Sequence, residues 1–144
     1  MMSFEKRQGQ YLVSCDPRRL NLDVIHGFLT QSYWANGITR EKVENSMRHS
    51  LCFGLYDGDS QIGFARVLTD YTHSALLADV FVLESHRKKG LGKFLVGSAL
   101  EHPDLHGLRR WTLATRDAHG LYAKLGFQPL SNPERFMERG KQIF

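Results

Sequence analysis

One stretch of this chain, residues 76–101, constrains its fold more than any other. The apolar run 76–83 has the length and composition of a buried strand, and it leads into the basic, glycine-rich turn 87–92, which reads RKKGLG. Apolar residues with helical spacing follow from Leu91 to Glu101. A strand, a basic loop and a helix in this order can hold a phosphate group. Glycines let the backbone approach closely, and the helix N-terminus attracts anions.

Two common phosphate-binding loops do not match this turn. A Walker loop needs Gly at position 87 and Ser or Thr after Gly92-Lys93, but the chain has Arg87 and Phe94 there. A Rossmann fingerprint needs a small third residue where this chain has Leu95. The remaining pattern, Arg-x-x-Gly-x-Gly directly after a strand, resembles the acetyl-CoA pyrophosphate loop of the GNAT superfamily of N-acetyltransferases. The alternative is an ordinary basic turn between a strand and a helix.

A second segment, 118–127, reads AHGLYAKLGF. Leu121 and Leu125 lie four residues apart on one face of a predicted helix, and Gly126 can end that helix in a left-handed conformation. Alone, this predicts only a capped helix. Beside the first motif, LYAKLGF resembles the LYxxxGF pattern that closes the acetyl-CoA site in GNAT proteins. The resemblance is clearest over 61–127. It implies transfer of an acetyl group from acetyl-CoA to a primary amine of a small molecule or peptide.

Tyr122 is the first catalytic candidate, because the resemblance brings it close to the cofactor sulfur. Attack of an amine on a thioester expels a thiolate, and the pKa of such a thiol is about 8.5. A phenol, with a pKa of about 10, stays protonated at neutral pH and can protonate that leaving group. The alternative interpretation is a packing tyrosine on a short helix.

Asp79 is the second candidate, as a general base or a water-positioning residue. It interrupts the apolar run 76–82, and a carboxylate in a covered sheet must be paired or face a wet cleft. A base is expected because a lysine-like amine, with a pKa of about 10.4, costs roughly 4–5 kcal/mol to deprotonate at pH 7. The position also resembles one where many GNAT proteins carry an acid. A structural salt bridge or a helix cap is the alternative.

The resemblance also implies a set of cofactor contacts. Backbone groups of Phe81 and Val82 are expected to hold the pantetheine arm, and the backbone amides of 88–93 the pyrophosphate. Thr115 stands seven residues before the tyrosine, where many GNAT proteins have an Asn that contacts the cofactor, so its hydroxyl would replace that amide only in part. The predicted cofactor-binding residues are Phe81, Val82, Arg87, Lys88, Lys89, Gly90, Leu91, Gly92, Lys93 and Thr115.

The predicted acceptor site lies in the loop between the first two helices, which often covers that site in GNAT proteins. Here the loop 32–38 reads SYWANGI. Tyr33 and Trp34 could form an apolar wall or hold a cationic amine over an aromatic ring. They could equally be a hydrophobic plug that anchors the end of a helix. The sequence does not identify the amine.

The rest of the chain alternates between predicted strands and helices. The predicted strands cover 11–14, 51–57, 61–69, 76–83 and 109–115, with short strands near the C-terminus. The predicted helices cover 22–32, with Asn21 as its cap, and 39–49, 91–101 and 118–125. The second helix begins at Thr39 in a near capping box that lacks the acid at its last position, and 57–59, which reads DGD, predicts a hairpin turn. Together with the resemblance, this predicts an α/β fold in a single domain, 1–144. We expect a mixed, mostly antiparallel sheet with helices on both faces and a splayed strand pair at the cofactor cleft.

The composition predicts a cytoplasmic protein with reduced thiols. The chain has 144 residues, 42% of them hydrophobic, and a formal net charge of +4; it has no membrane-length apolar run and no signal-peptide core. Cys15 and Cys52 lack metal-ligand spacing, and Pro103 separates His102 from His106, so no metal site is predicted. The expected partners are acetyl-CoA and an amine acceptor. A monomer or homodimer is expected, and no binding to membranes. Nucleic-acid binding is not expected either, because Lys and Arg are spread along the chain rather than clustered.

Two other functional classes remain open. One is a CoA-sensing or partner-binding domain that has lost catalysis, which the presence of both catalytic candidates disfavours. The other is an RNA-directed module, for which the chain carries no RNA-binding motif. Direct attack is favoured over a covalent enzyme intermediate, since neither cysteine has a neighbouring histidine in either motif. His86 and His119 flank the two motifs and are predicted to be solvated turn residues.

Overall fold

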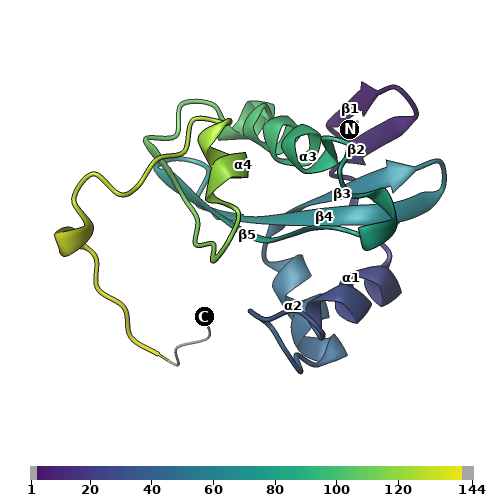
Figure 1. Ribbon diagram of the computed structural model, residues 1–144, viewed down its shortest axis with the longest axis horizontal. Helices are drawn as coiled ribbons and strands as arrows, with labels where there is room; N and C mark the ends of the chain where they lie inside the picture. Colours follow the sequence, from purple (N-terminus) through teal and green to yellow (C-terminus); the bar gives the residue numbers. More distant parts are fainter. Residues whose placement is uncertain (1–2, 141–144) are drawn as a thin grey trace.

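The computed structural model of the chain describes residues 3–140. Its centre is one six-stranded sheet whose strands lie side by side in sequence order (Figure 1). All neighbouring strands are antiparallel except the last two, which are parallel. The strands are β1 (Glu5–Gln8), β2 (Tyr11–Ser14), β3 (Leu51–Asp57), β4 (Ser60–Thr69), β5 (Ser74–Val82) and β6 (Arg110–Thr112). The α-helices are α1 (Leu22–Leu29), α2 (Arg40–Arg48), α3 (Leu91–Leu100) and α4 (His119–Ala123).

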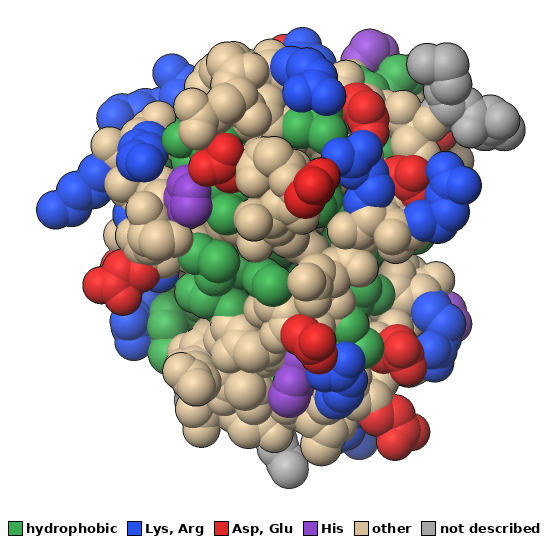
Figure 2. Space-filling view, turned by 90° about the vertical axis from the view of Figure 1, so that its right-hand side faces the viewer, with side chains coloured by type: hydrophobic (Ala, Val, Ile, Leu, Met, Phe, Trp, Pro, Cys, Tyr) green, Lys and Arg blue, Asp and Glu red, His purple; other side chains and the backbone are tan. Residues whose placement is uncertain are grey.

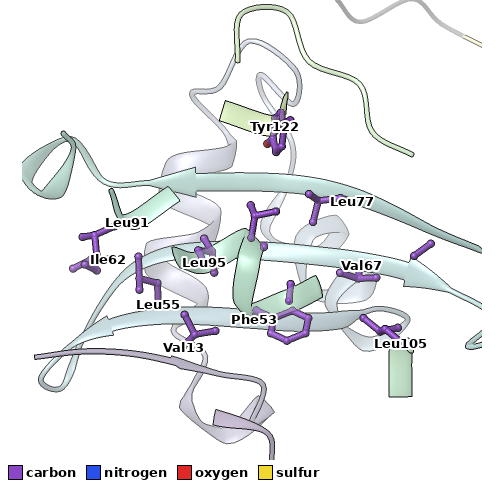
Figure 3. Close-up of a cluster of buried hydrophobic side chains, with 14 residues drawn as sticks. Val13, Phe53, Leu55, Ile62, Val67, Leu77, Leu91, Leu95, Leu105 and Tyr122 are labelled. Atoms are coloured by element: carbon purple, nitrogen blue, oxygen red, sulfur yellow. The ribbon is translucent and has the colours of Figure 1, made fainter. Parts of the chain in front are cut away.

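Helices cover both faces of the sheet, α3 and α4 on one face and α1 and α2 on the other (Figure 1). Leu95 of α3 packs in a core with Phe53 of β3, and this cluster reaches Tyr122 of α4 at its edge (Figure 3). On the opposite face, Ile25 of α1 packs in a second core with Cys52 of β3. The adjacent residues Cys52 and Phe53 thus serve different cores, as the two-residue period of a strand requires.

The helix caps and the hairpin turn predicted from the sequence are confirmed, because each depends only on residues close to it in the chain. Asn21 caps α1 by accepting a hydrogen bond from the Val24 N–H at 3.2 Å. Thr39 caps α2 in the same way, accepting from the Lys42 N–H at 3.2 Å. The turn between β3 and β4 places Gly58 in a left-handed conformation, with φ +61°. These caps and turns fix where the elements begin.

Several predicted boundaries were wrong. α1 ends at Leu29 rather than at residue 32, and the strand predicted over 109–115 is only three residues long, from Arg110. The strands predicted near the C-terminus are absent from the described residues 128–140, which run along the outside of the molecule. Conversely, the polar strand β1 was not predicted. It has no apolar periodicity and forms by pairing with β2 across the turn at Gly9.

A β-bulge interrupts β5 at the residue singled out from the sequence. Asp79 and Val80 lie opposite the single residue Ala65 of β4, because the pairing moves from Phe81 on one side to Ala78 on the other. Asp79 has φ +54°, in the left-handed region that Asp adopts more readily than most residues. The bulge lies beyond Leu76, the last residue of β5 that pairs with its parallel neighbour.

β5 and β6 separate after a short paired stretch. They pair only from Ser74 to Leu76 on β5, so residues 77–82 have no strand beside them on that side within residues 3–140. The mixed sheet with a splayed strand pair is therefore confirmed, and the gap opens toward the glycine-rich loop that follows β5.

The surface of the face in Figure 2 mixes both signs of charge. Basic and acidic side chains alternate over it, and hydrophobic side chains form a band across its middle. This face therefore has no continuous basic stripe of the kind that tracks a nucleic-acid backbone. No helix within residues 3–140 has both the length and the apolar character that crossing a bilayer would demand.

Candidate active site

The glycine-rich loop ends, as predicted, at the start of a helix. Gly90 stands directly before α3 in a left-handed conformation, with φ +74°, and Lys88 is also left-handed, with φ +65°. Gly90 has no side chain that could cap the helix, so no capping side chain takes the first N–H groups of α3. An uncapped helix start with a basic loop before it can receive an anion.

A cleft of about 320 Å³ opens at this helix start. Gly92 faces α4, since a Cβ there would lie in ordinary contact with Leu121, 3.4 Å from its Cδ2 atom. Both sequence motifs therefore meet at one cleft. Among the predicted cofactor residues, Lys89, Phe81 and Thr115 do not line it. The residues that do are Val82, His86, Arg87, Lys88, Gly90, Leu91, Gly92, Lys93, Leu121 and Lys124.

The backbone of Val82 faces the splayed side of β5. The Leu83 N–H donates to the Ile62 carbonyl across the β4–β5 ladder at 2.8 Å. Because bonded and non-bonded residues alternate in an antiparallel ladder, Val82 directs its own N–H and C=O away from β4, whereas Phe81 directs them toward it. The Nε–H of Arg87 donates to the Val82 carbonyl at 3.1 Å, which anchors the start of the loop to the end of the strand.

Asp79 is the centre of a polar network at the bulge. Its Oδ2 atom forms an ion pair with Arg66 Nε at 2.8 Å, and its Oδ1 atom accepts from Trp34 Nε1–H at 2.9 Å. The side chains of Asp79 and Arg66 are 12% and 16% exposed, so the pair is shielded from bulk water. Arg66 also donates to Ser50 Oγ at 3.1 Å. The salt bridge that the sequence left as an alternative is thus present, and the hydrogen bond from Trp34 joins the bulge to the α1–α2 loop.

Aromatic rings cover the site on the α1 side. Phe28 of α1 is stacked on Phe81, with ring centroids 4.1 Å apart and planes 10° apart. Trp34 packs against Phe28 and, edge to face, against Tyr33. Arg116, which precedes α4, places its guanidinium 3.8 Å from the centroid of the Tyr33 ring, and its N–H donates to Tyr33 Oη at 3.2 Å. The predicted acceptor loop therefore contacts both the bulge and the segment that leads to α4.

Tyr122 lies on α4 with 9% of its surface exposed, at the edge of the core (Figure 3). Burial raises the pKa of its phenol above the ordinary value of 10.0, and the nearby Tyr33 raises it further. The phenol therefore keeps its proton throughout the neutral range. The structure brings Tyr122, Tyr33, Trp34 and Asp79 into one region, although they come from three separate segments of the chain.

The two thiols are unsuited to act as nucleophiles. Cys52 is buried near the Arg66–Asp79 pair, and desolvation raises its thiol pKa to about 12. Burial also raises the pKa of the half-buried Cys15. A thiol of raised pKa holds its proton at neutral pH, and the thiolate is the reactive form.

Other residues considered from the sequence have structural partners. Thr115 Oγ1 accepts from the Ala118 N–H at 3.1 Å and so organises the turn into α4. His86 was predicted to be a solvated turn residue, which is wrong. It is half-buried at the cleft, with Nε2 3.0 Å from Asp57 Oδ2 and Nδ1 2.7 Å from Ser85 Oγ. His119 is exposed, as predicted. Within residues 3–140, no three His, Cys, Asp or Glu side chains are grouped so that they could hold a metal ion.

Sequence reasoning missed Arg66 and Arg116. Arg66 interrupts the apolar strand β4 just as Asp79 interrupts β5, and two opposite charges in neighbouring strands are a signal for a buried ion pair. Arg116 carries no such signal, since it lies in a loop and its contact with Tyr33 depends on how the two loops pack.

Comparison with known proteins places this geometry in a family. The model of the acetyltransferase (GNAT) domain matches residues 48–129. A protein from Gibberella zeae that is named as an acetyltransferase is 31% identical over 140 residues, covering 81% of this chain and 78% of that protein. A mycothiol acetyltransferase from Corynebacterium efficiens is 35% identical over 117 residues, covering 76% of this chain but 38% of that protein.

Solved structures show the same fold. A protein from Xanthomonas campestris pv. campestris, assigned to the GNAT family, is 47% identical with a TM-score of 0.88, covering 91% of this chain and 93% of that one. A protein from Staphylococcus aureus is 23% identical with a TM-score of 0.72, covering 92% and 99% of the two chains, and shows the fold alone. The domain match spans more than half of the chain and includes both motifs that meet at the cleft, so this protein belongs to the GNAT acetyltransferases.

Proposed function

We propose that this protein transfers the acetyl group of acetyl-CoA to a primary amine of a small molecule or peptide, by direct attack in a ternary complex. One observation carries the proposal. The uncapped start of α3, the splayed edge of β5 and α4 meet around one cleft, and α4 bears the buried phenol of Tyr122. The helix start suits a diphosphate, and the open edge of β5 suits the extended pantetheine arm. The phenol of Tyr122 suits a leaving thiolate that needs a proton.

The residues around the cleft fit the pyrophosphate and pantetheine parts of acetyl-CoA. The first-turn N–H groups of α3 would take the pyrophosphate, and Arg87, Lys88 and Lys93 at the cleft would add positive charge. Val82, whose backbone faces the splay, would bond the arm in the manner of an added strand. Phe81 is not part of this proposal, because its backbone groups face β4 and its ring is stacked on Phe28.

Tyr122 would supply the proton that the reaction needs at sulfur. Acetyl-CoA brings a thioester, and its cleavage by an amine releases a thiolate and an amide. The phenol, held protonated by burial, donates to that sulfur. General acid assistance of this kind typically contributes 10²–10⁴ in rate.

Asp79 would act on the acceptor side, directly or through a water molecule. Its two oxygens each accept one hydrogen bond in the structure, and a carboxylate oxygen has a second lone pair for a proton or a water. The rings of Tyr33 and Trp34 beside it would hold the carbon chain of the amine. Attack without an enzyme-bound acyl group agrees with the raised thiol pKa of Cys52.

The test is release of CoA from acetyl-CoA over a panel of polyamines, amino acids, aminoglycosides, aryl amines and lysine peptides. We expect turnover with at least one class. Calorimetry on Gly92→Ala should show CoA affinity at least about tenfold weaker, since the new methyl group lies at the helix start. Gly97→Ala is the matched control, because it adds the same methyl to α3, 3.7 Å from Leu125 and away from the first turn.

The outcomes separate the alternatives. CoA binding without turnover of any amine would favour a CoA-sensing domain instead. Equal CoA affinity in Gly92→Ala and Gly97→Ala would contradict the cleft as the pyrophosphate site. Gly90→Val is a poorer variant, since a β-branched residue at φ +74° would be strained whether or not a ligand binds.

A further inference from the structure

The loop between α1 and α2 contacts two side chains of opposite charge through neighbouring aromatic residues. Trp34 donates its Nε1–H to Asp79 Oδ1 at 2.9 Å, whereas the guanidinium of Arg116 lies 3.8 Å from the centroid of the Tyr33 ring. The rings of Tyr33 and Trp34 pack edge to face, with centroids 5.1 Å apart. A carboxylate therefore contacts one ring of this aromatic pair, and a guanidinium contacts the other.

This arrangement borders the phenol of the candidate active site. Besides burial, the nearby Tyr33 raises the pKa of the Tyr122 phenol, so the aromatic pair lies close to that group. Arg116 directly precedes the turn into α4, the helix that carries Tyr122. An acceptor whose amine reacts beside this phenol would therefore meet Asp79, the aromatic pair and Arg116.

The charges around the aromatic pair balance one another. Asp79 forms its ion pair with Arg66, and Arg116 contacts Asp117 with 3.3 Å between nitrogen and oxygen. In the part of the chain that the structure describes, the recorded contacts of Asp79 and Arg116 thus leave no surplus of negative charge that would attract a polycation. This disfavours polyamines and aminoglycosides, which carry several ammonium groups, and favours an acceptor with one positive and one negative group.

Arg116 is free to take a carboxylate from solution. Its side chain is 60% exposed and that of Asp117 is 66% exposed, so the contact between them is weak in water. A guanidinium presents its N–H groups in a planar fork that matches a carboxylate, and the ring of Tyr33 beneath it restricts its orientation. The backbone N–H of Arg116 also donates to Tyr33 Oη at 3.2 Å, which ties the two loops together.

We propose that the acceptor is an amino acid, whose amine is directed toward Asp79 and whose carboxylate is held by Arg116. This inference rests on the acetyl transfer proposed above and names its substrate class. The rings of Phe28, Tyr33 and Trp34 cover the carbon skeleton between the two charged groups.

The carboxylate of the acceptor takes no part in the reaction itself. The neutral amine nitrogen forms a bond to the acetyl carbon, and the bond from that carbon to sulfur breaks. The nitrogen loses one proton toward Asp79, and the leaving thiolate gains one from Tyr122. Arg116 is therefore a substrate-binding residue, and its effect should depend on whether the acceptor has a carboxylate.

Paired acceptors test the proposal. Each pair is an amino acid and the amine that lacks only its carboxylate. The pairs are L-phenylalanine with phenethylamine and aminocaproate with pentylamine, which sample a short and a long spacing of the two charges. We expect kcat/KM to be at least about tenfold higher for the amino acid in at least one pair. Arg116→Gln should lower kcat/KM for that amino acid at least about tenfold and leave its partner amine nearly unchanged.

Two further variants serve as comparisons. Arg116→Lys keeps the positive charge and should keep part of the preference for the amino acid. Arg7→Gln is the matched control, because it removes an exposed arginine from β1, the first strand in the sheet order, and should leave both members of each pair unchanged. A preference for the amine in both pairs, or equal values within both, would overturn the proposal. Equal losses for both members in Arg116→Gln would also overturn it and would mark a structural role.

Calorimetry separates this inference from the acetyl transfer itself. If no amine is turned over, the proposed function fails, but the amino acid should still bind the protein in the presence of CoA. Arg116→Gln should weaken that binding at least about tenfold. Absence of amino-acid binding, or binding that this variant does not weaken, would overturn the inference whether or not another amine is acetylated.

Discussion

The side chain of Tyr122 is buried and still carries a proton that it can donate, a combination that few side chains offer. It packs against Phe127, with ring centroids 5.9 Å apart, and in the proposed reaction it also presents a proton to the leaving sulfur. A phenol can do both, because its ring is apolar and its hydroxyl carries no charge at neutral pH. The upward shift of its pKa removes the competing phenolate form.

We expect Tyr122→Phe to lower kcat by roughly 10²–10⁴, about 3–5 kcal/mol of barrier, with little change in CoA affinity. The change removes one oxygen and keeps the ring, so the packing should persist. Stopped-flow measurement of the acetyl-transfer step is the appropriate readout, because product release can hide a slower chemical step. Tyr33→Phe is the matched control. An unchanged chemical step in the Tyr122 variant would leave this residue with a packing role only.

Asp79 combines a charge, a strand bulge and a contact with the acceptor loop. We expect Asp79→Asn to lower kcat/KM most near neutral pH and to regain activity at higher pH, where free amine is abundant. Asn tolerates the left-handed conformation, so the backbone should hold. The variant should also lose about 1–3 kcal/mol of stability, because Arg66 keeps its charge without its partner.

Arg66→Gln separates the two roles of Asp79. It breaks the same ion pair and should destabilise the protein by a comparable amount, yet it leaves the carboxylate in place. The pH profile of this control should therefore keep the wild-type shape. If the profiles of both variants match the wild type, Asp79 has a structural role only.

At the scale of elements, a buried glutamine links the sheet to α1. Gln61 is 4% exposed; its Oε1 atom accepts from the Asn21 N–H at 2.7 Å, and its Nε2 group donates to the Gly63 carbonyl at 3.0 Å. Asn21 is the cap of α1, so one side chain of β4 fixes the start of the helix that leads into the predicted acceptor loop. The position of that loop thus depends on the hydrogen bond between Asn21 and Gln61, which lies outside the candidate active site.

Gln61→Leu should lower the free energy of unfolding by about 1–3 kcal/mol, because it leaves a backbone N–H and a carbonyl without their partner. Urea denaturation measures this change. Gln10→Leu is the control, since it removes one exposed hydrogen bond to Asp57 and should change stability by less than about 0.5 kcal/mol. Equal losses in both variants would argue against a special role for Gln61.

Local signals in the sequence predicted the elements better than the contacts between them. The caps at Asn21 and Thr39 and the glycine-rich start of α3 depend on neighbouring residues, so spacing alone reveals them. The pairing of Asp79 with Arg66 depends on strand register, and a bulge changes that register. The contact of Arg116 with Tyr33 joins two loops separated by most of the chain, and no periodic pattern encodes it.

At the scale of the whole molecule, several titrating groups make the fold sensitive to acid. Burial lowers the pKa of His102 below the ordinary value of 6.5. Hydrogen bonds lower the pKa of Asp57, chiefly that from His86, and the pKa of Asp70, chiefly that from the His73 N–H. In each case the unfolded chain binds a proton more readily than the folded one, so stability falls as the pH falls.

We therefore expect two steps of destabilisation on acidification. The first begins near pH 6.5, where His102 in the unfolded chain takes up a proton, and ends once the pH has passed below the lowered folded pKa. The second begins below about pH 4, from the two carboxylates. Urea midpoints across pH should show both steps. His102→Asn, which can still accept from the Asp104 N–H, should remove the first step, whereas the exposed His119→Asn should keep it.

The bulge at Asp79 also determines which half of the molecule each part of β5 supports. Ala75 and Leu77, before the bulge, point into the core under α3, whereas Phe81, after it, points into the core under α1. All three carry odd numbers, so a strand without the extra residue would send them to the same side. The number of residues between Leu77 and Phe81 is thus a structural requirement of its own, beside the identity of Asp79. A single insertion or deletion there would turn one half of the strand inside out.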